Sequence, residues 1–140
     1  MEGGRVWVTT SDSRLFKIDT DRESGLLHAA IARMGRGNSI HQAFSDPHRR
    51  QWILADNGLY QYVGRRLRRV LRGRFLAATQ AGGITYFTST GGRVYAFDGR
   101  RFSMFRLKTD AAVTHAKASG SHRVVFGTAG DGVFCYDTPP

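Results

Sequence analysis

One hairpin-like pattern recurs four times along the chain, and it constrains the fold more than any other sequence feature. Each copy has a β-rich segment, a small polar turn and a second segment in which apolar and polar residues alternate with a strand's period of two. The copies span residues 5–19, 51–62, 84–98 and 124–137. Their turns carry serine, glycine, asparagine or aspartate, and the last three of these tolerate the positive φ of tight hairpin turns. Four β-hairpins are therefore predicted.

The spacing of the copies predicts the architecture. Equivalent positions are 45, 34 and 39 residues apart, and they are held by Trp7, Trp52, Tyr86 and Val125. Repeats of this length are typical of four-stranded β-propeller blades. We expect Trp7, Trp52 and Tyr86 to occupy equivalent blade positions and to be buried. A β-sandwich is the competing fold, but it gives no reason for the repeated hairpin.

Short strands are expected to flank the hairpins and complete the blades. They are predicted before the last three hairpins at 39–46, 74–80 and 112–118, and after the first three at 25–32, 65–72 and 101–108. This makes about fourteen strands, or about three and a half blades, whereas closed propellers usually have four to eight. The chain is thus predicted to be all-β, a single partial or open propeller segment over residues 1–140. Its blade-like copies are placed at about 5–36, 39–73, 74–109 and 112–138.

The first two copies resemble a known family. Residues 7–10 with 15–19, and residues 52–62, are similar to the repeats of two-component regulator propellers, which favour Trp, a small residue or Thr, and then Gly-Leu and an aromatic residue. The resemblance implies a sensory or interaction module with no catalysis of its own.

Two further resemblances point to other propellers. Residues 86–98 are similar to the pyrroloquinoline-quinone-like repeat, but the chain lacks that family's tryptophan-docking motif, so no cofactor is expected. Residues 15–19, 39–47 and 67–73 resemble, in their order, the amino-terminal propeller of vacuolar-sorting tether subunits. This last resemblance implies a scaffold subunit of an endolysosomal tethering complex.

Arginine dominates the charge of the chain and gathers in one segment. The net charge is +10, and only Lys17, Lys108 and Lys117 are lysines among the 21 basic residues. Six arginines lie within the ten positions 65–74, and Gly64 and Gly73 bracket the first five. The six are the candidate anion-binding or partner-binding residues: Arg65, Arg66, Arg68, Arg69, Arg72 and Arg74.

Three interpretations of this arginine segment stay open. As an outer blade strand, its charge would discourage edge-to-edge aggregation. As a helix, it would place Val63, Leu67, Val70 and Leu71 on one face and suit a membrane surface or a partner. As an anion-binding patch reinforced by arginines 49, 50, 100 and 101, it would contact phosphate or carboxylate groups with strong salt dependence. The glycines and the repeat register favour the strand.

No pattern predicts an enzyme. The five histidines are scattered singly, at positions 28, 41, 48, 115 and 122, without metal-ligand spacing. There is no Gly-x-Ser-x-Gly nucleophile elbow. The single cysteine, Cys135, excludes an internal disulfide and a cysteine-based zinc site. It is predicted to be a small core residue.

These observations predict a non-catalytic propeller segment that acts as a protein-interaction or sensory scaffold, without cofactor or metal. The alternatives are a basic module that docks on RNA or another polyanion, and the tethering-complex scaffold. The expected partner is a protein or the remaining blades of a larger propeller. Self-association is an alternative, because an open array would leave apolar sheet faces uncovered. No signal peptide or apolar span of membrane length is seen, so a soluble, cytoplasmic chain is expected.

Overall fold

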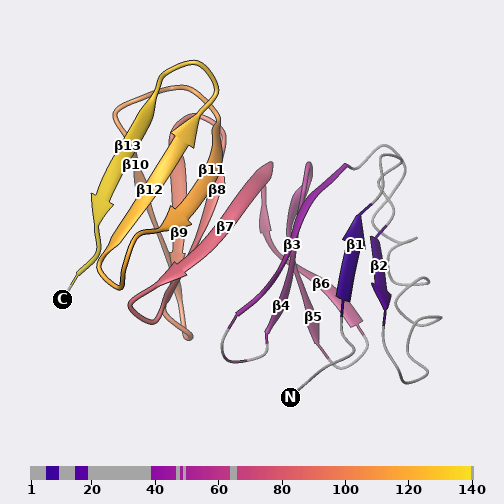
Figure 1. The fold of residues 1–140 in the computed structure, drawn as a ribbon. Coiled ribbons are helices and arrows are strands. Elements are labelled where there is room, and N and C mark those ends of the chain that lie inside the picture. The colour runs from indigo at the N-terminus through magenta and orange to yellow at the C-terminus, as the bar shows by residue number, and fades with distance from the viewer. Residues whose placement is uncertain are drawn as a thin grey trace. The chain divides into compact units, whose positions relative to one another are not determined.

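The computed structural model describes residues 6–9, 15–18, 39–46, 48, 50–63 and 66–139, the first two ranges as backbone only. Every regular element within these ranges is a β-strand, and the strands form antiparallel sheets (Figure 1). The chain divides into two compact units, Met1–Gly73 and Arg74–Pro140. Each unit is described by itself.

The first unit contains a hairpin and a four-stranded sheet. The hairpin pairs β1 (Val6–Thr9) with β2 (Leu15–Ile18). The sheet follows chain order through β3 (Ile40–Ser45), β4 (Gln51–Ala55), β5 (Gly58–Val63) and β6 (Arg66–Arg72). The strand predicted at 25–32 and the turn predicted at 11–13 lie outside the described residues.

The second unit contains a complete and an incomplete meander. The complete one joins β7 (Phe75–Ala81), β8 (Ile84–Ser89), β9 (Arg93–Phe97) and β10 (Phe102–Arg106). The other has three described strands, β11 (Val113–Ala118), β12 (Arg123–Thr128) and β13 (Val133–Asp137). Propeller blades are four-stranded antiparallel sheets, and the two complete sheets have this form, so the predicted all-β class with blade-like sheets is confirmed.

The repeat seen in the sequence is also a repeat of strand register. Each anchor residue pairs with the same position of the following strand. That position lies two residues after the first apolar residue of the strand. The four pairs are Trp7 with Lys17, Trp52 with Gln61, Tyr86 with Ala96, and Val125 with Cys135. In the last three sheets a register shift also recurs at one place in the first strand, near Ile40, Phe75 and Val113. The anchors therefore hold equivalent blade positions.

Burial of the anchors follows the prediction where side chains are described. Trp52 is 1% exposed and Tyr86 is fully buried. Val125, the anchor of the sheet with three described strands, is only half-buried. The side chain of Trp7 lies outside the described residues.

Opposite faces of the β3–β6 sheet carry different parts of the core. One face buries Ile40, Ile53, Ala55 and Tyr60, with Leu67 of the outer strand packed against them. Trp52 belongs to the other face, because successive residues of a strand point to opposite sides of the sheet.

In the second unit the two sheets pack face to face through aromatic side chains. Tyr86 of β8 meets the rings of Phe105, Phe126 and Tyr136 at centroid distances of 5.8–6.4 Å, tilted by 68–76°. Phe105 stacks on Tyr136 with centroids 4.5 Å apart. Edge-to-face and offset contacts of this kind are worth about 0.5–1.5 kcal/mol each beyond burial. They fix one blade against the next.

Gly92 supports the turn between β8 and β9. Its φ of +71° lies in the left-handed region, and a Cβ there would collide with the carbonyl oxygen of Thr109. Its backbone N–H donates to the carbonyl of Ala111 at 2.9 Å, and its carbonyl accepts from the N–H of Leu107 at 2.8 Å. A side chain at this position would strain the backbone and separate the turn from the segment that leads into β11.

Candidate interaction surfaces

The arginine segment forms the outermost strand of the first unit's blade. It is strand β6, so the strand interpretation is confirmed and the helical one is wrong. Arg66, Arg68, Arg69 and Arg72 are exposed along it, and Arg74 is exposed just after it. Arg65 and Arg49 lie outside the described residues. The described arginines follow one exposed strand and its end.

The arginines of β6 divide between the two faces of the sheet. Arg66 and Arg68 pair with Val63 and Gln61 of β5, whereas Arg69 pairs with Tyr60 and therefore lies on the opposite face. The aliphatic part of Arg69 crosses Gly58, where a Cβ would clash with it. Its Nη1 donates to the carbonyl of Asn57 at 3.4 Å. Arg69 is thus partly held by the hairpin turn.

The described part of this blade contains few acids to neutralise these arginines. From residue 39 to residue 73 the sequence has only Asp46 and Asp56 as acidic residues. Both are engaged elsewhere: Asp46 pairs with Arg50, and Asp56 pairs with His41. Among the described residues, no acidic side chain forms an ion pair with Arg66, Arg68 or Arg72. The strand therefore presents a concentrated positive potential to solvent.

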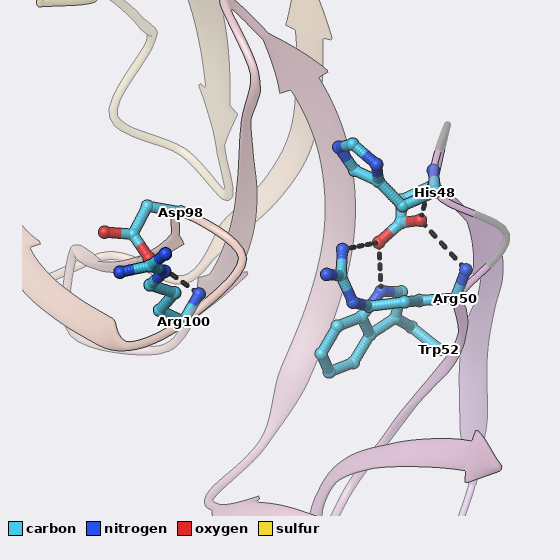
Figure 2. Close-up of polar contacts among 6 residues, drawn as sticks. His48, Arg50, Trp52, Asp98 and Arg100 are labelled. Atoms are coloured by element: carbon cyan, nitrogen blue, oxygen red, sulfur yellow. Dashed lines mark hydrogen bonds and ion pairs between the residues drawn. The ribbon is translucent and has the colours of Figure 1, made fainter.

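Asp46 organises the loop between β3 and β4, and sequence reasoning missed it. Its side chain is 1% exposed and accepts the backbone N–H groups of His48 and Arg50, both at 2.9 Å. It also accepts Nη1 of Arg50 at 3.4 Å and the indole Nε1 of Trp52 at 3.2 Å. Figure 2 shows these groups converging on the carboxylate. The sequence signal for this contact is an aspartate, Asp46, six residues before the blade tryptophan Trp52.

His41 and Asp56 form a second polar contact at the inner strand of the same blade. The His41 Nε2 lies 2.6 Å from Oδ1 of Asp56, and both side chains are partly exposed. His41 sits at the register shift of β3, which turns its side chain toward the β4–β5 turn. The contact joins the innermost strand to that turn.

In the part of the chain that the structure describes, the remaining titratable groups do not form a shared site. The described residues hold no group of three or more His, Cys, Asp or Glu side chains placed to bind a metal ion. His115 contacts the hydroxyl of Thr114 through Nδ1 at 2.9 Å. His48 lies in the Asp46 loop, and His28 lies outside the described residues.

Within the described residues, three groups have perturbed pKa values with clear local causes. Burial raises the pKa of Tyr86 to about 12, with a smaller contribution from Tyr136. The hydroxyl of Tyr86 has no hydrogen-bond partner among the described residues. The backbone N–H groups of Arg101 and Arg100 lower the pKa of Asp98, and the Arg100 bond is visible in Figure 2. The hydrogen bond from Arg123 to Asp137 raises the pKa of Arg123.

Cys135 is exposed, so its assignment to the core is wrong. The neighbouring aromatic residues Phe134 and Tyr136 occupy the packed face of β13, and alternation places Cys135 on the other face. That far face is also more polar than expected. It carries His115, Lys117, Arg123 and Asp137, with Val133 as its exposed large apolar side chain. The expectation of a broadly apolar uncovered face is therefore wrong for this sheet.

Comparison with known proteins supports the fold. No family model matches the chain, and no curated protein matches it. Two solved structures of the extracellular domain of BT4673 from B. thetaiotaomicron are similar to it, one described as a one component system and one as a hybrid two component system. Both give a TM-score of 0.70 at 13% identity over 100% of this chain.

The likeness to BT4673 concerns the fold alone. The chain covers 21% and 20% of those two chains, so it spans about a fifth of their length. Within the described residues, no helix is long and apolar enough to cross a membrane.

Proposed function

We propose that the chain is a non-catalytic β-propeller segment that serves as a protein-interaction or sensory module. The observation that carries this proposal is the match of its blades, over the whole chain, to the extracellular domain of a two component system protein. Rigid blades with exposed outer strands and turns suit recognition, because binding residues can vary there without disturbing the core. The resemblance of the repeats to two-component regulator propellers supports the same function.

Location and assembly remain part of this proposal. The similar structures are extracellular domains, which favours an extracytoplasmic location over the cytoplasmic one expected from the sequence. Protease accessibility of the natural protein in intact cells distinguishes the two. The proposed partner is another protein or the remaining blades of a larger propeller, with self-association and the tethering-complex scaffold as alternatives. Size-exclusion chromatography with light scattering tests self-association.

A ligand panel tests the non-catalytic assignment. Extended peptides, oligosaccharides and heparin fragments are added to the chain, and its melting temperature is followed. If the chain is an interaction module, its melting temperature should rise with the concentration of a ligand that binds the folded state. Mass spectrometry of the ligand after incubation should then show its mass unchanged. Conversion of a ligand to product at catalytic turnover would refute the proposal.

A second candidate function, docking on RNA or another polyanion, is favoured by strand β6. Its exposed arginines lack acidic partners among the described residues, and guanidinium groups suit phosphate contacts. Each phosphate contact to a single strand contributes about −0.7 to the slope of log K against log salt. Three arginines at positions 66, 68 and 72 would therefore contribute about −2.

Charge-matched variants test this second function. Changing Arg66, Arg68 and Arg72 to Gln should reduce retention on single-stranded RNA. It should also reduce the magnitude of the slope of log K against log salt by about 2. The control changes three arginines whose side chains already have hydrogen-bond or ion-pair partners, Arg93, Arg106 and Arg123, to Gln and lowers the net charge equally. Equal loss in both triple variants would mean that net charge, and not strand β6, carries the binding.

A further inference from the structure

Strand β6 is the outer strand of a blade that already has all four strands. It pairs with β5 along one edge, and the chain then leaves through Gly73 and begins β7 of the next sheet. The other complete sheet also ends at its fourth strand, β10. Among the described strands, none pairs with the other edge of β6. That edge is therefore the outer surface of a finished blade, and a strand that pairs with it comes from outside the repeat.

Strand β10 holds the same place in its sheet, so it shows what an outer strand of this fold requires. Both strands place half-buried apolar residues at the same ladder positions. These are Leu67 and Leu71 in β6, and Phe102 and Phe105 in β10. The exposed positions differ, because β6 has Arg68 and Arg69 where β10 has Ser103 and Met104. Protection of an edge against aggregation therefore does not account for the arginines of β6.

The arginines of β6 are spaced so that an extended chain can match them. Arg66 and Arg68 project from one face of the sheet and are two residues apart, which is roughly 6.7 Å along a strand. Leu67 lies between them on the other face, where it packs against the core. A strand laid beside β6 presents every second side chain to one face at the same spacing. Its side chains can therefore reach both guanidinium groups and Leu67 together.

Charge determines that the matching side chains are acidic. Among the described residues, no acidic side chain forms an ion pair with Arg66 or Arg68. The two acids of this blade, Asp46 and Asp56, are paired with other residues. Guanidinium groups bind carboxylates through paired hydrogen bonds of fixed geometry. A partner with carboxylates at alternate positions would thus neutralise the exposed face of β6.

The burial of the aromatic rings disfavours a nucleic acid as the partner. Proteins that bind single strands stack the bases on exposed aromatic side chains. In the described part of this sheet the aromatic side chains are buried or half-buried, namely Phe44, Trp52, Tyr60 and Tyr62. Strand β6 instead offers charge and a free backbone edge, which are the features that an extended peptide recognises.

We propose that the outer edge of β6 binds an extended segment of a partner protein that carries acidic residues at alternate positions. Two carboxylates face Arg66 and Arg68, the residue between them packs against Leu67, and backbone groups pair along the strand. The inference rests on the proposed function, of which it names the surface and the class of partner.

A fluorescent seven-residue peptide in which glutamate and valine alternate is the probe. Anisotropy measures its binding to the full chain. The control peptide has the same composition with its glutamates contiguous, so it has equal charge but cannot match the spacing. The alternating peptide should bind at least about tenfold more tightly. Equal binding of the two peptides would overturn the proposal, and so would tighter binding of a single-stranded RNA of equal charge.

Methylated forms of the alternating peptide test the backbone pairing. Only every second amide of an added strand faces its neighbour. Methylation of the valine amides or of the glutamate amides should therefore weaken binding in one case only. Equal weakening in both cases, or none in either, would overturn the assignment of the peptide as an added strand.

Variants of the chain locate the site on β6. Changing Arg66 and Arg68 to Gln should weaken binding of the alternating peptide at least about tenfold. Arg68→Ser, which gives β6 the residue that β10 holds at this position, should weaken it several-fold without unfolding the blade. The control changes Arg93 and Arg106 to Gln, which lowers the net charge as much as the first variant and should have little effect. Equal loss in the two double variants would overturn the proposal.

An acidic segment of this chain is tested as a competing occupant. Asp19, Asp21 and Glu23 are the acidic residues of the sequence that stand at alternate positions. Changing them to Asn, Asn and Gln should leave binding of the alternating peptide unchanged. Tighter binding to this variant would overturn the proposal, because the chain would then compete for its own edge.

Failure of this inference is distinguishable from failure of the proposed function. If the peptide does not bind while another ligand of the panel stabilises the chain and is recovered unchanged, only the strand proposal fails. If a ligand is converted to product, the interaction function fails, whatever the peptide does.

Discussion

Truncation of Trp52 to alanine removes the largest buried side chain of the β3–β6 blade. Trp52 is 1% exposed and holds the anchor position of the second repeat. Its loss should destabilise the first unit strongly, because a side chain of this size leaves a cavity that the surrounding sheet cannot fill.

The expected magnitude has two parts. Replacing a buried tryptophan by alanine typically costs about 3–5 kcal/mol, through lost burial and the cavity. The hydrogen bond from Trp52 Nε1 to Asp46 is also lost, and a bond to a charged group contributes about 1.5–3 kcal/mol. Trp52→Phe removes the Nε1 donor and part of the ring but keeps some of the packing, so it should cost less than Trp52→Ala. A domain with about 5–15 kcal/mol of stability would lose a large fraction of it in Trp52→Ala.

Urea unfolding followed by far-ultraviolet circular dichroism measures the effect without relying on tryptophan fluorescence. Trp52→Ala should lower the midpoint most, and Trp52→Phe should lower it less. Met104→Ala is the control: its side chain is 49% exposed, so its midpoint should shift little. If Trp52→Ala unfolds at the same urea concentration as the parent, the assignment of the repeat anchor to the blade core is refuted.

Three further changes test other parts of the structure. The raised pKa of Tyr86 contributes stability that is complete below pH 10 and is lost as the pH rises to about 12, by about 2–3 kcal/mol. In alkaline unfolding titrations, the Tyr86→Phe variant should therefore lose less stability than the parent over that range. Equal losses would contradict the burial argument. Gly92→Ala should lower the melting temperature more than Gly130→Ala, because both have positive φ but only Gly92 faces a carbonyl where its Cβ would lie; equal shifts would exclude that clash. Cys135, being exposed, should react fully with a thiol reagent in the native chain, and reaction only after unfolding would restore the core assignment.

The hairpin repeat predicted the blades because its signal is local. A turn residue that tolerates positive φ and the alternation on either side are both visible in a short window of sequence. The shared register of Trp52, Tyr86 and Val125 follows from that pattern and is confirmed by their ladder partners. Long-range information was not needed to find the strands.

The exposure of side chains that a neighbouring sheet can cover could not be predicted from the local sequence pattern. Cys135 looks like a core residue because it lies between the aromatic residues Phe134 and Tyr136 in a strand. Val133 looks like one because it is the first apolar residue after a turn, as Val94 is. Their exposure is decided by whether another strand and another sheet cover them, which no local pattern records. The four donors on Asp46 were missed for a related reason, since a loop carboxylate has no periodicity.

The arginine segment lies between these cases. Its strand character was predicted from the repeat register and the bracketing glycines, and β6 confirms it. Which arginines are neutralised depends on where Asp46 and Asp56 point, and both are held by other partners. What the exposed arginines bind stays a prediction.

Residue-resolved amide hydrogen exchange tests most directly that the chain repeats one blade and that, among the described strands, β13 pairs with β12 alone. Without a partner, the amides of Phe134, Tyr136 and Thr138 should exchange slowly, and those of Val133, Cys135 and Asp137 should exchange fast, since alternate amides face β12 and the N–H of Thr138 donates to the carbonyl of His122. The equivalent amides of β9, Val94 and Ala96, should be slow, because β10 covers them. Equal protection of both sets in β13, or fast exchange at Val94 and Ala96, would contradict this account.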